Sequence, residues 1–172
     1  MVLLEILQAI WFIWPAYTAN AFPTVLHGKG ALDFGKNFGK NRLLGDSKTI
    51  GGTVGGIVFG IFIGLIQMNV HGYLPQNLGL FKFTVSAIVL LSVGTFAGDI
   101  VGSFIKRRMN IKPGDPALLL DQLGFLVAAL LFVSLVHVTP FKMVIILLII
   151  TPIIHLGANI VGYLLKLKKH PW

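Results

Sequence analysis

The chain has 172 residues, of which 55% are hydrophobic and only 12% are charged, well below the charged fraction of about a quarter that is usual for a soluble domain. Its net charge of +8 comes from short basic clusters beside apolar segments, without the repeated basic and aromatic surface expected of a nucleic-acid-binding protein. Because the chain has no cysteine, disulfides, thiolate nucleophiles and cysteine-ligated metals are excluded.

Five apolar segments, each long enough to cross a bilayer, predict transmembrane helices at about residues 2–26, 50–68, 81–105, 117–138 and 141–165. The first is interpreted as a retained helix, because no basic region and no small-residue cleavage site mark it as a signal peptide. No long linker or internal repeat divides the chain. We therefore predict an all-α integral membrane protein of about five transmembrane helices, in which residues 1–172 form one domain and the cytoplasmic loops form an active site.

The connection between the first two helices is rich in glycines and in cations. Lys36, Lys40 and Lys48 lie among nine glycines between Gly28 and Gly56. Glycines leave backbone amides free to face an anion and the lysines can neutralise it, so this segment favours phosphate binding. The alternative interpretation is a flexible basic loop that lies on anionic lipid head groups.

Helix three carries the most informative acidic residue. Asp99 lies about six residues before the predicted end of this helix, or ~9 Å inside the membrane segment. A carboxylate there is costly, which favours a catalytic or metal-binding role; the alternative is an ion pair with a nearby Lys or Arg. Ser103 follows at i+4 and Lys106 three residues later, so the three side chains share one helical face.

Asp121, in the first turn of helix four, can approach the same cavity from the other side of the connecting loop. Mg²⁺ typically takes one or two protein carboxylates and completes its shell with phosphate oxygens and water. Asp99 and Asp121 are therefore predicted to be ligands of a Mg²⁺-nucleotide site. The alternative for Asp121 is an acidic residue that is favoured only by the helix N-terminus.

The basic residues also predict an orientation. Of the 14 Lys and Arg residues, only Lys82 and Lys142 lie in the second and fourth connections, while the others lie in the first and third connections and the C-terminal tail. Because short cytoplasmic loops are enriched in Lys and Arg, we predict a multi-pass protein of the cell membrane with its N-terminus outside and its C-terminus and active site on the cytoplasmic side.

Two ordered motifs resemble the membrane CTP:lipid-phosphate cytidylyltransferases. The stretch from Gly98 to Arg107, followed by Lys112 and Asp121, is similar to the signature of CDP-diacylglycerol synthases, in which Ser, Lys-Arg, Lys and a terminal Asp recur at similar spacing. The first loop is similar as well, through Phe34-Gly35-Lys36-Asn37-Phe38-Gly39-Lys40 and then Lys48, Thr49 and Gly52.

Departures from the bacterial signature point to the archaeal branch of this family, the CDP-archaeol synthases. Lys112 is followed by Pro113-Gly114-Asp115, and the bacterial His-Gly-Gly is missing. The segments resembling the archaeal branch are Leu44-Gly45-Asp46-Ser47-Lys48-Thr49, Ile111-Lys112-Pro113-Gly114 and Leu120-Asp121-Gln122-Leu123. The roles of Asp33, Asp46 and Asp115 are not assigned by the resemblance.

The resemblance implies an enzyme that transfers CMP from CTP to an archaeal diether lipid, 2,3-bis-O-geranylgeranylglycerol 1-phosphate, with Mg²⁺ and release of pyrophosphate. Asp99, Asp121, Ser103 and Lys106 would be catalytic. The residues expected to hold nucleotide or phosphate are Lys36, Lys40, Lys48, Thr49, Gly52, Arg107 and Lys112. The expected partners are CTP, the lipid and the membrane, without nucleic acid; the sequence does not specify an oligomeric state.

Three alternatives stay open at this point. The first is a CDP-diacylglycerol synthase, which differs in the chains of its lipid. The second is a small membrane transporter, although its route would need polar groups spread across the bilayer, whereas the ionisable residues here crowd at one face. The third is a lipid-binding scaffold without any reaction.

Overall fold

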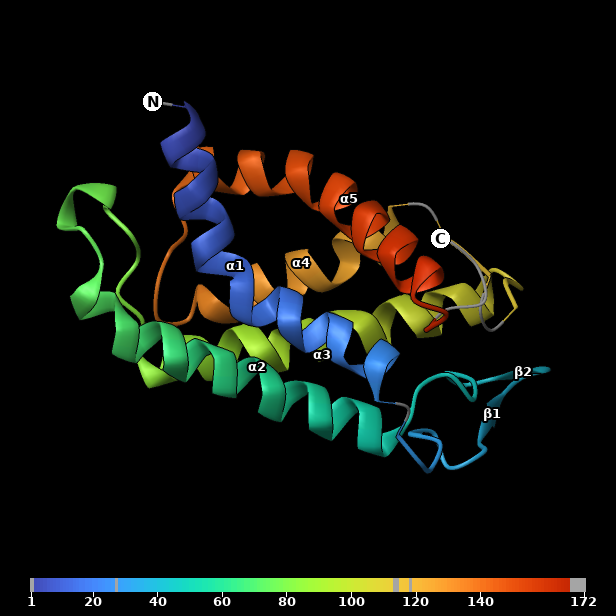
Figure 1. Cartoon of the computed structure of the whole chain (residues 1–172). Helices are drawn as coiled ribbons and strands as arrows, with labels where there is room; N and C mark the ends of the chain where they lie inside the picture. The colour runs from blue at the N-terminus through green and yellow to red at the C-terminus, as the bar shows by residue number, and fades with distance from the viewer. Residues whose placement is uncertain (1, 27, 113–114, 118, 168–172) are drawn as a thin grey trace.

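The computed structural model describes residues 2–26, 28–112, 115–117 and 119–167. In this part of the chain the helices are α1 (Val2–Val25), α2 (Ile50–Val70), α3 (Val85–Arg108), α4 (Leu120–Val133) and α5 (Phe141–Leu164) (Figure 1). Two very short strands, β1 (Asn37–Phe38) and β2 (Asn41–Arg42), pair as a hairpin, and one-turn helices lie at His71–Tyr73 and Gln76–Leu78. The predicted all-helical membrane fold is confirmed.

Four described segments are long and apolar enough to cross a bilayer: Val2–Val25, Ile50–Tyr73, Val85–Arg108 and Phe141–Leu164. Three of them begin and end within a few residues of the predicted boundaries. The third begins at Val85, four residues later than predicted, because the preceding segment stays extended. Trp11 Nε1 donates a hydrogen bond to Phe81 O over 3.0 Å, and Thr84 then caps the helix.

Helix α4 is shorter than the predicted segment 117–138 at both ends. Its 14 residues span only ~21 Å, less than the hydrocarbon core of about 30 Å. At its start, Asp121 Oδ2 accepts a hydrogen bond from the Ala117 amide. Beyond its end the chain is still apolar, but the His137 ring packs 4.5 Å from the Phe81 ring, centroid to centroid. Hydropathy alone does not detect such a contact.

Helix α2 packs through a stripe of buried glycines at i, i+4 spacing: Gly52, Gly56, Gly60 and Gly64. A Cβ added at Gly60 would lie 2.8 Å from Pro15 O on α1 and 2.7 Å from Ser92 Oγ on α3. Three helices therefore approach closely at this point, as small residues permit in membranes.

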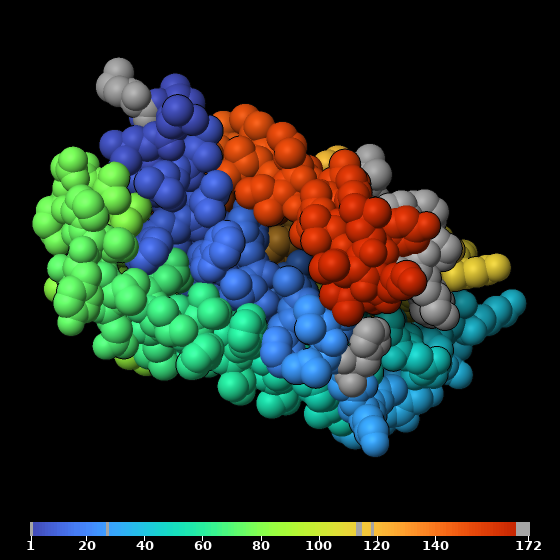
Figure 2. Space-filling view, viewed as in Figure 1, coloured from blue at the N-terminus to red at the C-terminus, as the bar shows by residue number. Residues whose placement is uncertain are grey.

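Different segments of the chain lie at the two ends of the molecule. The hairpin, the C-terminal end of α3 and the end of α5 gather at one end, and the N-terminus and the α2–α3 connection lie at the other (Figure 1). In the space-filling view, residues 28–49 lie at the first of these ends beside the start of α2 (Figure 2).

Two of the sequence predictions fall partly outside the described residues. These are the motif containing Pro113-Gly114 and the basic tail, of which Lys168 and Lys169 are not described.

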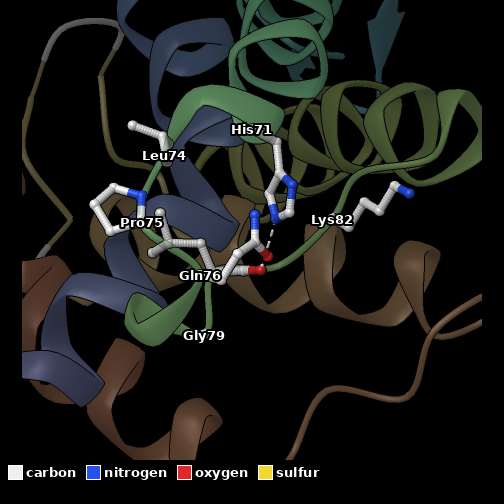
Figure 3. A pocket seen from close by; sticks show the side chains of 7 residues that line it. His71, Leu74, Pro75, Gln76, Gly79 and Lys82 are labelled. Carbon is white, nitrogen blue, oxygen red and sulfur yellow. Dashed lines mark hydrogen bonds between the residues drawn. The ribbon is translucent and has the colours of Figure 1, made fainter.

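A small pocket of about 80 Å³ lies in the α2–α3 connection (Figure 3). One ring nitrogen of His71 lies 3.1 Å from Leu80 O, which closes the connection on itself. The pocket is far smaller than the 300–1,000 Å³ typical of ligand sites. It is too small for a nucleotide or a lipid, and the residues predicted to be catalytic lie elsewhere in the molecule.

Candidate active site

Asp33 organises the first loop from its interior. The carboxylate is fully buried and accepts hydrogen bonds from the backbone amides of Gly35, Leu44 and Gly45 at 3.0–3.1 Å. It also accepts a hydrogen bond from Arg42 Nη2 over 2.7 Å. One side chain thus joins the beginning of the loop to the segment that leads toward α2.

The charge of Asp33 is stabilised by these donors. The Arg42 guanidinium, helped by the three backbone amides, holds the pKa of this carboxyl well below its usual range, although burial opposes the shift. Asp46 contacts the same guanidinium from outside, with 2.8 Å between its Oδ1 and Arg42 Nη1, but its side chain is 81% exposed. The two aspartates therefore offer a matched comparison of a buried and a surface partner.

The hairpin is attached to the C-terminal end of α3 by polar and aromatic contacts. Arg108 lies over the rings of Phe38 and Phe104, 4.9 and 4.8 Å from their centroids, and donates to Phe38 O and Arg42 O. Asn41 Nδ2 donates to Arg107 O over 2.9 Å. The loop is therefore fixed against the helix that carries the predicted catalytic residues.

Two lysine–carboxylate pairs lie where the loops meet α3. Lys48 Nζ lies 2.5 Å from Asp99 Oδ2, which joins residues far apart in the sequence. Lys106 Nζ lies 2.7 Å from Asp121 Oδ1, which joins α3 to the first turn of α4. The predicted approach of Asp121 to the α3 face of Lys106 is therefore present in the structure.

Asp99 lies deeper than expected. Because α3 continues to Arg108, this carboxylate is about 14 Å from the C-terminal end of the helix. Its side chain is nevertheless 28% exposed, and that of Lys48 is 24% exposed. Both side chains thus keep part of their surface uncovered by the rest of the protein.

Arg107 is the most unusual cation of the site. It is only 5% exposed, and its Nε and Nη1 atoms have no hydrogen-bond partner among the residues that the structure describes. A buried charge without a hydrogen-bonded partner is costly, so this guanidinium is suited to an anionic ligand. Ser103, one turn earlier, is also buried at 4% exposure.

Thr49 and Gly52 occupy the start of α2. The Thr49 hydroxyl caps this helix by accepting a hydrogen bond from the Gly52 amide over 3.1 Å. The amides of Ile50 and Gly51 donate to Gly30 O and Lys29 O. These amides are engaged within the protein, and a role of Thr49 and Gly52 in holding phosphate stays a prediction.

The remaining predicted phosphate-binding lysines lie apart from this cluster. Lys36 and Lys40 are exposed on the hairpin, and Lys112 is exposed after α3. Sequence reasoning did not assign Asp33, Asn41 or Arg108, the residues that hold the loop in place. The spacing of Asp33 and Gly35 resembles a side-chain turn and could have indicated the first of them, whereas no local pattern distinguishes Arg108 from Arg107.

Known proteins resemble the chain over nearly its whole length. The family described as CarS-like, CDP-archaeol synthase, matches residues 2–172. A CDP-archaeol synthase of Pyrococcus furiosus is 46% identical over 97% of this chain and 98% of its own length, and one of Pyrococcus horikoshii is 47% identical over 98% of each. The solved structure of an intramembrane enzyme for archaeal membrane lipid biosynthesis is 36% identical, covers 90% of this chain and 94% of its own, and superposes with a TM-score of 0.78.

The helical fold and the charged cluster at one end of it define an intramembrane enzyme. The chain belongs to the CarS-like family, the CDP-archaeol synthases. The resemblance predicted from the two motifs is thereby confirmed, as is the prediction of an enzyme of archaeal membrane lipid synthesis.

Replacement of Asp33 by Asn should loosen the loop, because Asn places an amide NH2 donor where a carboxylate oxygen accepted hydrogen bonds. A lost charged acceptor is worth about 1.5–3 kcal/mol, so amide protection in residues 33–45 should fall by roughly tenfold or more. Hydrogen exchange in detergent micelles measures this effect. Asp46→Asn is the matched control and should leave protection nearly unchanged, since its side chain is 81% exposed.

The stability of the first loop should depend on pH in a defined direction. Because the pKa of Asp33 is lowered in the folded protein, its contribution to stability is fully present above the ordinary aspartate pKa of about 3.9 and is lost as the pH falls below it. Protection of the loop should therefore decline below about pH 4 in the wild type. Equal pH profiles for the wild type and Asp33→Asn would contradict this role of Asp33.

Proposed function

We propose that the chain transfers the CMP group of CTP to the phosphate of 2,3-bis-O-geranylgeranylglycerol 1-phosphate, giving unsaturated CDP-archaeol and pyrophosphate. The observation that carries the proposal is the buried guanidinium of Arg107, which has no described hydrogen-bond partner at Nε and Nη1 and lies on the same helix as one member of each lysine–carboxylate pair. The names of the relatives support this choice of substrates.

The reaction needs no covalent enzyme intermediate. One oxygen of the lipid phosphate forms a bond to the α-phosphorus of CTP, and the bond from that phosphorus to the bridging oxygen breaks, so that its electron pair leaves with pyrophosphate. A phosphate monoester is already largely a dianion at neutral pH, since its second pKa is near 6. The protein therefore contributes mainly positioning and neutralisation of charge.

Three cations are placed to neutralise the phosphates. Arg107 can donate from its unpaired nitrogens, and Lys48 and Lys106 can exchange their carboxylate partners for phosphate oxygens. Ser103 lies between Asp99 and Lys106 along α3 and can donate its hydroxyl proton to a phosphate oxygen. In this proposal the exposed Lys36, Lys40 and Lys112 attract the anionic nucleotide from solution.

Asp99 and Asp121 would hold a Mg²⁺ ion. Their carboxylates are the hard oxygen donors that Mg²⁺ prefers, and it usually needs only one or two from the protein. The donor set therefore fits, although in the structure each carboxylate is neutralised by a lysine. When bound, the ion would supply charge stabilisation on the phosphates.

The proposed active site faces the cytoplasm. The loop of residues 28–49 and the ends of α3 and α5 gather at one end of the molecule, which is the end rich in Lys and Arg (Figure 1). The described cations of the opposite end are Lys82 and Lys142, and the latter pairs with Glu5. The N-terminus would accordingly lie outside the cell.

The first test is the formation of CDP-lipid by purified protein with CTP and Mg²⁺. We expect the isoprenoid diether glycerol phosphate to be preferred several-fold over diacyl glycerol phosphate in kcat/KM, since apolar chains give only about 1–3 kcal/mol of discrimination per group. A preference for the diacyl lipid would favour CDP-diacylglycerol synthesis instead. No CDP-lipid from either substrate would refute the proposed reaction, and a transporter would then be the leading alternative.

Asp99→Asn and Asp121→Asn should each lower turnover by about a hundredfold or more, because each removes a carboxylate proposed to bind the metal. Pyrophosphate release at saturating Mg²⁺ measures this effect. Glu5→Gln is the matched control, since it breaks a lysine–carboxylate pair at the opposite end of the molecule and should retain activity. Near-normal turnover of either aspartate variant would remove that residue from the proposed metal site.

Single cysteines test the orientation cleanly, because the natural chain has none. A cysteine introduced at Lys36 should react with a membrane-impermeant thiol reagent only after the cytoplasmic side is opened. One at Gln76, in the α2–α3 connection, should react in intact cells. The opposite pattern, or labelling of both from one side, would show that the proposed topology is incorrect.

A further inference from the structure

An apolar groove of about 600 Å³ runs between α3 and α4. Its volume lies within the range of pockets that hold small ligands. The lining residues that matter below are Val101, Gly102, Leu120, Leu123, Val127 and Leu131. Val127 and Leu131 are 44% and 64% exposed, so the groove opens on the apolar flank of the helices.

The groove follows the contact between the two helices, which is close at Gly94 and Gly98 and looser at Gly102. At Gly98 their backbones touch, since an added Cβ would lie 2.4 Å from Gly124 O. At Gly102, one turn further along α3, the nearest atom to an added Cβ is a Leu120 side-chain carbon at 3.8 Å. A methyl group at Gly102 would only just contact Leu120, so α4 leaves more room here than at Gly98.

The groove ends beside the charged cluster. Gly102 and Leu120 line that end, and the next residues along the chain are Ser103 and Asp121. Lys106, one turn beyond Gly102, contacts Asp121 at 2.7 Å. An elongated apolar molecule in the groove would thus have one end at the cations of the site.

The length of the groove suits a lipid chain. The lining residues of α4 extend from Leu120 to Phe132, a distance of ~18 Å along the helix. One leaflet of the hydrocarbon core is about 15 Å deep, half of the usual 30 Å. A chain that starts at the charged end can therefore lie in the groove over the full depth of its leaflet.

We propose that this groove binds one of the two apolar chains of the lipid phosphate substrate, while the other chain stays in the bilayer. The inference rests on the proposed function, because that function places the lipid phosphate at the cations. The groove aligns the lipid so that its phosphate arrives beside Lys106. A second copy of the protein is a less suitable occupant, since its apolar surface would not account for a groove that ends at cations.

The test fills the groove from the exposed side. Val127 lies ~10 Å along α4 from Leu120, and Val127→Trp should occupy the space that the chain needs. We expect the KM for the geranylgeranyl diether glycerol phosphate to rise about tenfold and the KM for CTP to stay unchanged. Val58→Trp is the matched control, because Val58 is 60% exposed on α2 and lies outside the groove.

Two further measurements make the result specific. A diether glycerol phosphate whose chains end before Val127 should be used equally well by wild type and Val127→Trp. A diether glycerol phosphate with a photoreactive diazirine in mid-chain should label peptides of α3 or α4 in the wild type, and Val127→Trp should lose this labelling.

The outcomes separate the two proposals. Absence of CDP-lipid in the wild type would refute the proposed function, whereas normal wild-type turnover with an unchanged lipid KM in Val127→Trp would refute only the groove. An equal rise of KM in Val58→Trp would also overturn the groove. So would a changed oligomeric state of Val127→Trp by light scattering, because the groove would then be a contact between copies.

Discussion

A carboxylate in the middle of an apolar helix needs a partner, and Asp99 obtains it from Lys48. Asp99 lies about 14 Å inside α3, where an unpaired charge would be unfavourable. Lys48 is followed directly by Thr49, the residue that caps α2. The ion pair therefore fixes where the first loop ends, where α2 begins and how that helix is placed against α3. The glycine stripe of α2 then allows the two helices to pack closely.

The arginines at the end of α3 have contrasting surroundings. Arg108 packs over two aromatic rings and donates to two carbonyl oxygens of the hairpin, so its charge is used for structure. Arg107 is more buried, and the described residues leave two of its nitrogens, Nε and Nη1, without a hydrogen-bond partner, compared with only Nε of Arg108. Since a fold gains nothing from an unsatisfied buried cation, the difference between these neighbours favours a ligand for Arg107. Asp33 supports the arrangement by holding the loop in shape from within.

The sequence predicts those features that depend on local periodicity. The i+4 and i+3 spacings of Asp99, Ser103 and Lys106 place them on one face, and the apolar segments locate the five helices. It does not predict contacts between distant segments. The pairing of Lys48 with Asp99 requires the loop to fold back on α3, and the early end of α4 coincides with packing of His137 against Phe81. The pairing of Asp33 with Arg42 is not predictable either, because Arg42 can equally pair with Asp46 four residues later, and in the structure it contacts both.

The end of α3 can serve two substrates of opposite character because successive residues of a helix point about 100° apart. Gly102 lines the apolar groove. Ser103, the next residue, is buried and lies on the helix face that also carries Asp99 and Lys106. A nucleotide from solution and a lipid from the bilayer can therefore approach one helix end from different sides. The lipid phosphate needs little lateral movement to reach the nucleotide, since one helical turn separates Gly102 from Lys106. On this view, the short α4 and its looser contact with α3 at Gly102 are functional features, because closer packing there would close the charged end of the groove.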